Sequence, residues 1–440
     1  MKKISRRSFL TAAAACGAAA ALTACGGSSS STAASSTAAS STAASSEASG
    51  PVTLQWAVWD KESTPYWQAT ADGYMESHND VTIEMVDLGS SDYMTVLATQ
   101  LAGSADLDIL TIKDIPGYAN LINLDYLKPL NDVLTRDTGD FNGTIEQLTT
   151  DDGNFYAVPF RSDFWVLYYN KDLFDAAGVE YPSNDLTLED YDALARKMTS
   201  GSGDSKVYGC HYHTWRSAAS LFSILDGKHT IIDGTYDFMK DTYDMVIAQQ
   251  KDGICMDYGY LKTSSLHYSA AFENQQCAMV NMGSWFISTL ESYMKDAETK
   301  FNWGIVKYPH PAGAPAGSTL GTVTSLAINV DSPKADAAAD FINWCVSEEG
   351  AQAIAKTGTF PACGSSATSD IIKSTEGFPD DANSVDALTT SNVYLEMPYT
   401  QYASDIETIL NAEHDAIMTM SETVDEGIQN MNDQVPAVLG

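Results

Sequence analysis

Basic residues are scarce in this chain of 440 residues, which has 24 Lys and Arg against 58 Asp and Glu and a formal net charge of −34. Some of these few lie at the extreme N-terminus, at Lys2, Lys3, Arg6 and Arg7, so the remainder is more acidic still. A surface of this charge repels nucleic acid and anionic lipid headgroups. We therefore expect no nucleic-acid partner and no membrane association through charge.

The sequence also lacks several motifs of catalytic and cofactor sites. It has no phosphate-binding G-x-x-x-x-G-K, no zinc-binding H-E-x-x-H and no G-x-S-x-G around a nucleophilic serine. Cys210, His211 and His213 resemble part of a metal cluster, and the two histidines would share one face of a strand. Because no fourth ligand is evident, we predict no metal and no other cofactor.

Cysteine is present, but no two cysteines form a C-x-x-C pair. The odd number that follows Cys25 leaves at least one thiol free in an exported chain, and the sequence does not decide whether any disulfide forms. We expect most of these thiols to be small buried apolar groups. The seven cysteines are Cys16, Cys25, Cys210, Cys255, Cys277, Cys345 and Cys363.

The N-terminal apolar run, from Phe9 to Ala24, is too short and too poor in large apolar side chains to span a bilayer comfortably. With the basic residues before it, residues 1–25 have the pattern of an export signal that is removed. Leu22-Thr23-Ala24-Cys25 resembles a bacterial lipobox, in which Cys25 takes a diacylglyceryl group and becomes the first mature residue. An ordinary small-residue cleavage site is the alternative.

The route of export stays open. Ser5-Arg6-Arg7-Ser8-Phe9-Leu10 resembles a twin-arginine signal, which implies export in the folded state. Adjacent arginines also occur by chance in such segments, so the general secretory route remains the alternative.

The segment after Cys25 predicts a flexible tether. Residues 26–50 are almost entirely Ser, Ala and Thr, with Glu47 as the single charge, and have nothing to pack into a core. A tether directly after an acylated cysteine would hold a soluble domain near a membrane. About 390 residues follow, more than one core normally supports, which predicts two lobes.

Alternating strands and helices open the folded part. The residues that end the first and third strands, Trp59, Asp60 and Asp114, should share one edge of a parallel sheet. Ligands bind at this edge in open α/β sheets. The expected strands are 52–59, 81–86 and 107–113, with helices beginning near Pro65 and covering 93–101.

The stretch 154–174 is the strongest signal in the chain. It is rich in aromatic and β-branched residues, which favours a strand buried on both faces. Near its start it carries Arg161 and Asp163, which are expensive to bury without partners. This combination indicates a strand that passes a cleft.

The same stretch resembles a signature of the solute-binding proteins of ABC importers, in the family 1 extracellular type that includes the maltose-binding protein. The resemblance lies in the A-x-P segment at 157–159 and in Tyr-Asn-Lys-Asp-Leu-Phe at 169–174. A second motif, A-F-x-N-x-x-x-A-M followed by Gly283-Ser284-Trp285, resembles another segment of that family. The resemblance implies that Trp285 stacks on a sugar face and that an aromatic near Tyr399 or Tyr402 contributes to the cleft.

The fold that the resemblance implies is α/β and two-lobed, of the periplasmic-binding-protein type II. Each lobe would be a mainly parallel sheet flanked by helices, with the chain crossing near Phe160 to Asp163, near Val306 and near Phe360. We also expect a strand at 207–213, one helix over 334–357 and a helical C-terminus around 404–432. The predicted lobes are 51–161 plus 306–358 and 162–305 plus 359–440.

The candidate ligand residues combine aromatic rings with charged groups. Rings cover the apolar faces of a sugar, while carboxylates and guanidinium groups bind its hydroxyls. The alternatives are that each Trp is a core residue and that Arg161 and Asp163 form an ion pair without a ligand role. The candidates are Trp59, Asp60, Asp114, Arg161, Asp163, Trp215, Trp285 and Tyr399.

We therefore predict a monomeric, lipid-anchored, extracytoplasmic binding protein that is not an enzyme. It would bind a carbohydrate between its lobes, close by a hinge and deliver the ligand to an ABC permease in the membrane. One alternative is the same fold with a peptide or polyamine ligand, for which Asp60, Asp114 and Asp163 would act as counter-ions. Another is a cell-surface glycosidase that uses two acidic side chains as acid and base.

Overall fold

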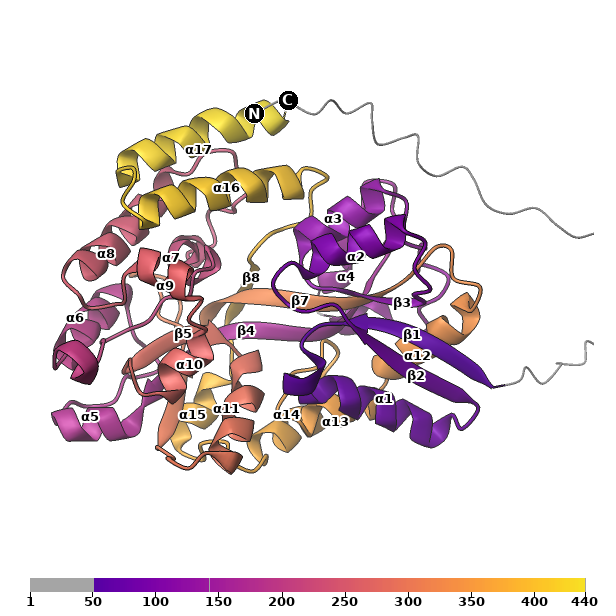
Figure 1. Cartoon of the computed structure of the whole chain (residues 1–440), viewed down its shortest axis with the longest axis horizontal. Coiled ribbons are helices and arrows are strands. Elements are labelled where there is room, and N and C mark those ends of the chain that lie inside the picture. Colours follow the sequence, from indigo (N-terminus) through magenta and orange to yellow (C-terminus); the bar gives the residue numbers. More distant parts are fainter. Residues whose placement is uncertain (1–50, 142, 440) are drawn as a thin grey trace, which may run out of the picture. The chain divides into compact units, whose positions relative to one another are not determined.

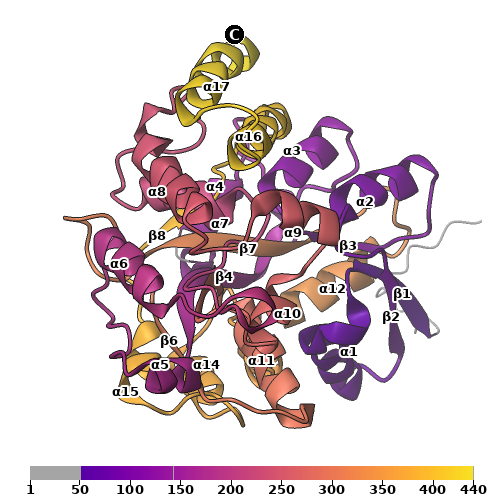
Figure 2. The ribbon, with the colours of Figure 1, turned by 60° about the vertical axis from the view of Figure 1, so that its left-hand side comes forward.

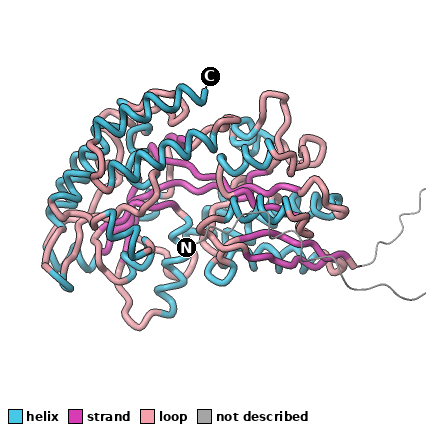
Figure 3. Tube along the Cα trace, turned by 45° about the horizontal axis from the view of Figure 1, so that its top comes forward, coloured by secondary structure: helices cyan, strands magenta, loops and turns pink. Residues whose placement is uncertain are grey.

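The computed structural model describes residues 51–141 and 143–439 (Figure 1). The predicted export signal, lipobox and tether lie outside the described residues. Within the described part, no helix combines the length and the apolar character that a membrane span requires. Figure 3 shows the strands running through the middle of this part, with helices on both sides of them.

The first part of the folded region has the predicted alternation of strands and helices. β1 lies between β2 and β3 and pairs with both in parallel, with Val52 opposite Val81 and Trp56 opposite Ile109. The three predicted strands and the two predicted helices are confirmed here. The elements are β1 (Val52–Val58), α1 (Pro65–Ser77), β2 (Val81–Asp87), α2 (Tyr93–Ala102), β3 (Ile109–Ile112), α3 (Ile115–Asn123) and α4 (Thr144–Leu148).

β4 (Val158–Asn170) is the strand predicted from the central stretch, and nearly all of its 13 residues are buried. Its first half pairs antiparallel with β7 (Ser318–Ile328), and its second half pairs antiparallel with β5 (Met279–Gly283) and β6 (Trp303–Lys307). One strand therefore belongs to two sheets. Figures 1 and 2 both show β4 and β7 between α16 and α17 on one side and α11 on the other.

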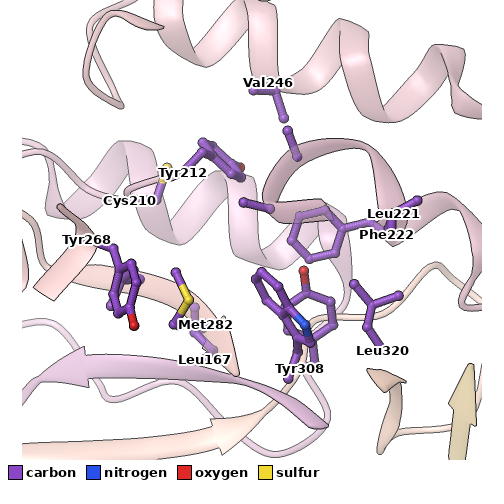
Figure 4. Packing of buried hydrophobic residues seen from close by; sticks show 14 of the residues in the cluster. Leu167, Cys210, Tyr212, Leu221, Phe222, Val246, Tyr268, Met282, Tyr308 and Leu320 are labelled. Atoms are coloured by element: carbon purple, nitrogen blue, oxygen red, sulfur yellow. The ribbon is translucent and has the colours of Figure 1, made fainter. Parts of the chain in front are cut away.

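Two hydrophobic cores lie along β4. Phe160 packs in the first core with β1 and β3, whereas Trp165 packs in the second core with β5 and β6. Figure 4 shows part of the second core, where Phe222 stacks on Tyr308 with ring centroids 4.7 Å apart. The two-lobed α/β fold predicted from the sequence is confirmed.

The lobe boundaries stay a prediction, and we propose one change to them. Val306, where a return crossing was expected, packs in the second core. Along β7, by contrast, Leu320 packs in the second core and Leu326 in the first. We therefore propose that the return crossing runs along β7.

The third expected crossing, near Phe360, lies against β4. The backbone N–H of Ser162 donates to Phe360 O at 3.2 Å, and that of Ala362 donates to Phe160 O at 3.0 Å. The segment 360–362 therefore pairs with β4 on the edge opposite β7. All three segments that join the two cores are hydrogen-bonded side by side.

Three local expectations were wrong. The second sheet is antiparallel along β4 rather than mainly parallel, because β4 enters it directly from the first sheet and pairs there with β5 and β6. The segment 207–213 makes only isolated β-bridges and forms no strand. A Cβ on Gly209 would lie 1.7 Å from the carbonyl oxygen of Ala195, so the segment is packed closely against the helix that contains Ala195.

The third error is the single helix over 334–357, which is divided in two. The side chain of Ser347 accepts a hydrogen bond from Gly350 N and so begins a new helix. The C-terminal helical region is similarly divided at Met420, whose φ is +56°. The resulting helices are α12 (Ala335–Cys345), α13 (Glu348–Ala355), α16 (Ala403–Met418) and α17 (Val424–Leu439).

The remaining α-helices and β8 all follow β4 in the chain. The helices are α5 (Lys171–Ala177), α6 (Leu188–Met198), α7 (Ser217–Ser220), α8 (Lys240–Lys251), α9 (Tyr258–Ser264), α10 (Tyr268–Glu273), α11 (Trp285–Asp296), α14 (Ser366–Lys373) and α15 (Ala382–Ala387), and β8 (Asn392–Leu395) pairs with β7. Short 3-10 helices lie at Lys61–Ser63, Thr138–Phe141, Gly203–Ser205, Leu221–Ile224 and Asp237–Met239.

Glu291 of α11 is a buried carboxyl close to the third crossing. Its Oε1 accepts a hydrogen bond from Thr375 Oγ1 at 2.6 Å, and a Cβ on Gly358 would lie 2.9 Å from its Oε2. Burial raises the pKa of Glu291 from 4.5 to about 7. The folded protein therefore binds more protons than the unfolded chain between these two pH values, and stability falls as the pH rises through this window.

We predict that Glu291→Gln removes this pH dependence, since the amide keeps the acceptor for Thr375 without a charge. Relative to the variant, the wild type should lose roughly 2 to 3 kcal/mol of unfolding free energy between pH 4.5 and pH 8. Urea unfolding at both pH values measures the difference. Glu349→Gln on the exposed face of α13 is the matched control, and equal pH dependence in wild type and Glu291→Gln would contradict the assignment.

Candidate functional site

A cavity of about 760 Å³ is lined by residues that flank both cores. One side consists of the segment 90–95, of residues 113–116, which follow β3, and of two residues of α4, Thr144 and Leu148. The other side consists of residues 213–217, one face of α16 and residues 395–397. Residues 321–323 of β7 complete the lining, so the strand that joins the two cores also reaches the cavity.

Lys113 and Asp114 line the cavity from the first core, directly after β3. Asp114 caps α3 by accepting a hydrogen bond from Gly117 N at 2.7 Å. Burial raises the pKa of Asp114, and Glu407 from α16 adds to this increase. Lys113 Nζ donates to Ser90 O at 2.6 Å, and burial lowers the pKa of Lys113. The strand end thus delivers both an acceptor and a donor, as expected for this edge of an α/β sheet.

Trp215 provides an exposed aromatic surface on the opposite side. Its side chain is 40% exposed although it belongs to a cluster of rings. The ring centroids of His213, Tyr268 and Trp285 lie 4.6, 5.7 and 6.2 Å from that of Trp215. These neighbours fix the orientation of a large apolar ring that remains available to a ligand.

The polar face of α16 lies behind Trp215. Glu407, Asn411 and His414 are spaced by four and three residues and therefore share one side of the helix. Arg216 crosses this side, with Nη2 donating to Glu407 Oε2 at 2.7 Å and Nε donating to Asn411 Oδ1 at 3.2 Å. Burial lowers the pKa of His414 to about 3, so this imidazole is neutral at physiological pH.

Glu396, just after β8, is a third carboxylate held in a fixed orientation. Its Oε1 accepts hydrogen bonds from Trp165 Nε1 and from Thr322 Oγ1, both at 2.7 Å. Burial raises the pKa of Glu396. Because one oxygen takes both bonds, the other oxygen of this carboxylate is left to accept from a ligand.

Asp114 and Trp215 are the two residues predicted from the sequence that line the described cavity. Trp59 is only 7% exposed and packs against Trp67 and Tyr93, so it supports the wall behind Lys113. Asp60 has a φ of +46°. Burial lowers the pKa of His267, and the negative charge of Asp60 partly counteracts this decrease.

Tyr399 packs edge to face against Tyr118, with ring centroids 5.9 Å apart. It is partly buried between the two cores and contacts both of them. Like the roles of Trp59 and Asp60, its role in ligand binding stays a prediction.

Arg161 and Asp163 form a buried ion pair on β4, which was the alternative to a ligand role. Asp163 also accepts from Ser284 Oγ at 2.7 Å, and the Arg161 guanidinium lies 4.8 Å from the centroid of the Tyr66 ring. With partners on several sides, the pair is compensated within the protein. A direct contact of either residue with a ligand stays a prediction.

Trp285 is partly buried and folds back over Gly283, where a Cβ would lie 2.0 Å from its ring. This close approach explains why glycine precedes the Ser-Trp pair of the motif. Trp285 Nε1 donates to Tyr268 OH at 3.1 Å, and its ring meets Trp165 edge to face. Trp285 therefore supports Trp215, and its predicted stacking on a sugar is untested.

Sequence reasoning missed Arg216 and the polar face of α16. Polar residues at a spacing of four and three are also the pattern of a solvated helix face, so Glu407 and Asn411 carried no distinctive signal. Arg216 follows Trp215 directly, and this adjacency was the one usable hint.

His211 and His213 lie near His267, but the described residues include no group of three or more His, Cys, Asp or Glu that could hold a metal ion.

Comparison with known proteins gives two family matches. Residues 60–352 match the model of the bacterial extracellular solute-binding protein family. Residues 3–23 match the model of a twin-arginine translocation signal sequence. Together they indicate an extracytoplasmic location.

The curated relatives include sn-glycerol-3-phosphate-binding periplasmic proteins UgpB. That of Pectobacterium atrosepticum is 25% identical over 57% of this chain, and this chain spans 59% of its length. That of Yersinia pestis is 24% identical over 82% of this chain and 86% of the relative.

Two solved structures are also similar. A sugar transporter of Rhizobium etli, in an open conformation, is 47% identical with a TM-score of 0.75, over 88% of this chain and 99% of that one. An ABC substrate-binding protein of Listeria monocytogenes in complex with cycloalternan has the same fold, with 20% identity, a TM-score of 0.74 and the same coverage. Because the family model matches more than half of the chain, this chain belongs to the bacterial extracellular solute-binding proteins, family 1 of the ABC importers.

Proposed function

We propose that this protein binds a neutral carbohydrate in the cavity beside Trp215 and presents it to an ABC permease. The observation that carries the proposal is the exposed Trp215 ring next to polar groups that are already oriented, Arg216, Glu407 and Glu396. A sugar needs an apolar surface for its C–H face and fixed donors and acceptors for its hydroxyls. The cavity offers both within one site.

The charges of the cavity favour a neutral ligand over an anionic one. Each basic side chain has a partner: Arg216 binds Glu407, Lys262 binds Asp415, and Lys113 donates to a backbone oxygen. A phosphate would therefore meet more carboxylates than uncompensated cations. The acidic lining residues are Asp92, Asp114, Glu396, Glu407 and Asp415, against Lys113, Arg216 and Lys262.

The similar structures agree with a sugar ligand, since the Rhizobium protein is a sugar transporter and the Listeria protein holds cycloalternan. The curated relatives bind sn-glycerol 3-phosphate, an anion. The excess of acidic residues in this cavity disfavours an anionic ligand. A peptide or polyamine could use Asp114 as a counter-ion, and a glycosidase could use Asp114 and Glu396 as acid and base. These two alternatives decide the design of the first experiment.

Hinge closure follows from the placement of the ligand groups on both cores. A ligand that contacts Asp114 on one side and Trp215 on the other gains more contacts in a closed form than in an open one, and this difference shifts the population. The closed form would dock on the permease, with the protein acting as a monomer. Acylation of Cys25 would keep it at the membrane surface.

The proposal is tested by a thermal-shift screen of residues 51–440 against mono- and oligosaccharides, sn-glycerol 3-phosphate, peptides and polyamines. A ligand of the folded state raises the unfolding midpoint with its concentration. We expect a neutral sugar to raise it and to be recovered intact on product analysis. Recovery of a cleaved sugar would identify an enzyme, and a shift with amines or peptides alone would discard the sugar.

We predict that two tryptophan substitutions separate binding from support. Trp215→Ala should weaken sugar binding by about 1 to 3 kcal/mol through lost stacking, with a loss of stability below about 1 kcal/mol because the ring is half exposed. Trp285→Ala should reduce stability by roughly 2 to 3 kcal/mol, because its ring packs against Trp165 and Tyr268. Calorimetric titration and urea unfolding measure the two effects, and the reverse ranking would exchange the two roles.

The lipid anchor is tested by fractionating cells that express the full chain. Cys25→Ser should release the protein from the membrane fraction, because a single acylated cysteine is the proposed attachment. Cys16→Ser, within the predicted signal, is the matched control and should leave the protein in that fraction. Release of neither variant, or of both, would count against acylation of Cys25.

A further inference from the structure

Arg216 is a buried cation that lines a cavity, and one of its guanidinium nitrogens has no hydrogen-bond partner in the described part of the chain. Its residue is 6% exposed, and two of its three guanidinium nitrogens bind Glu407 and Asn411. Its third nitrogen, Nη1, has no hydrogen-bond partner among the residues that the structure describes. A buried guanidinium N–H without a partner costs free energy, and a ligand that accepts from it recovers that cost.

His414, one turn after Asn411 in α16, also has a buried ring nitrogen without a partner. Its Nδ1 shares a hydrogen bond of 3.0 Å with Tyr243 OH, while Nε2 has no partner within the described part of the chain. The residue is 1% exposed and lines the same cavity. Two residues that line the cavity thus each hold a buried nitrogen without a hydrogen-bond partner in the described part of the chain.

The charge of Arg216 is already balanced. Glu407 holds Nη2 at 2.7 Å and is itself fixed by Asn411 Nδ2, which donates to its Oε1 at 3.0 Å. Glu396 lies close enough for Arg216 to oppose the increase that burial causes in its pKa. A group that approaches Nη1 thus meets a hydrogen-bond donor inside a cluster that has no net positive charge.

We propose that the Arg216–Glu407 pair sets the charge specificity of the cavity, admitting hydroxyl groups and rejecting phosphate and carboxylate groups. The inference rests on the proposed function for the identity of the ligand, but the pair can be tested without knowing it. A hydroxyl accepts from Arg216 and donates to a nearby carboxylate, so both of its functions are used. An anion only accepts, and it would bury a second negative charge next to Glu407 and Glu396.

The decisive variant is Glu407→Gln, which removes the compensating charge and keeps the length and an oxygen acceptor for Arg216. The matched control is Asp405→Asn, an exposed position on the same helix whose change removes the same charge. Glu407→Asp is the second variant. It keeps the negative charge, but its side chain is one methylene shorter, so the carboxylate lies farther from Arg216 Nη2. Circular dichroism and the unfolding midpoint establish that each variant is folded.

The first probe is inorganic phosphate, with chloride at equal ionic strength as the reference. We expect no phosphate-dependent shift of the midpoint for the wild type or Asp405→Asn, a concentration-dependent rise for Glu407→Gln, and a smaller rise for Glu407→Asp. Adding Arg216→Met to Glu407→Gln should abolish the gain. If folded Glu407→Gln and Glu407→Asp respond to phosphate no more than Asp405→Asn does, the proposal is wrong.

The second probe is the neutral sugar that gives the largest shift in the screen, compared with its uronic acid by calorimetric titration. Glu407→Gln should bind the neutral sugar about tenfold more weakly, as for the loss of one charge-assisted contact, and should bind the uronic acid more tightly than the wild type does. An unchanged preference would overturn the inference while leaving sugar binding intact. If no sugar binds but Glu407→Gln gains phosphate, the proposed function fails and the charge specificity of the pair stands.

Discussion

The fold depends on one ribbon of backbone hydrogen bonds, in which β4 pairs with β7 on one edge and with residues 360–362 on the other. The three segments that join the two cores are all part of this ribbon, so the cores are connected by backbone that is hydrogen-bonded side by side. The buried Arg161–Asp163 pair lies on β4 within it. These hydrogen bonds fix the register of the segments that join the two cores.

The cavity follows from this geometry. β3 ends beside it with Lys113 and Asp114, and β7 contributes residues 321–323 to its lining, so strands of the sheet that joins the two cores also form part of the cavity wall. Trp215 and α16 complete the cavity from the second core. The exposed aromatic ring and the oriented polar groups thus come from different elements, and they converge only in the folded chain.

The sequence predicted what strong local patterns encode. The alternation of β1, β2 and β3 followed from apolar periodicity, and a strand within 154–174 followed from its aromatic and β-branched residues. The two-lobed fold followed from the chain length and from the resemblance of two motifs to a known family. It did not predict the bent segment 207–213, because contact with the Ala195 carbonyl is tertiary. In the site, Asp114 and Trp215 could be found from their places after a strand and before a helix, whereas Glu407 and His414 could not, because on sequence alone their helix face is indistinguishable from a solvated one.

The two faces of α16 have separate tasks. Ile406, Leu410 and Ile417 pack in the second core, while Glu407 and Asn411 line the cavity and hydrogen-bond to Arg216. Substitutions at Glu407 and Asn411 therefore change the lining of the cavity and remove no apolar side chain from the second core. On such a helix the residues that pack the core differ from the residues that line the cavity, so the lining can vary in sequence while the packed face stays the same.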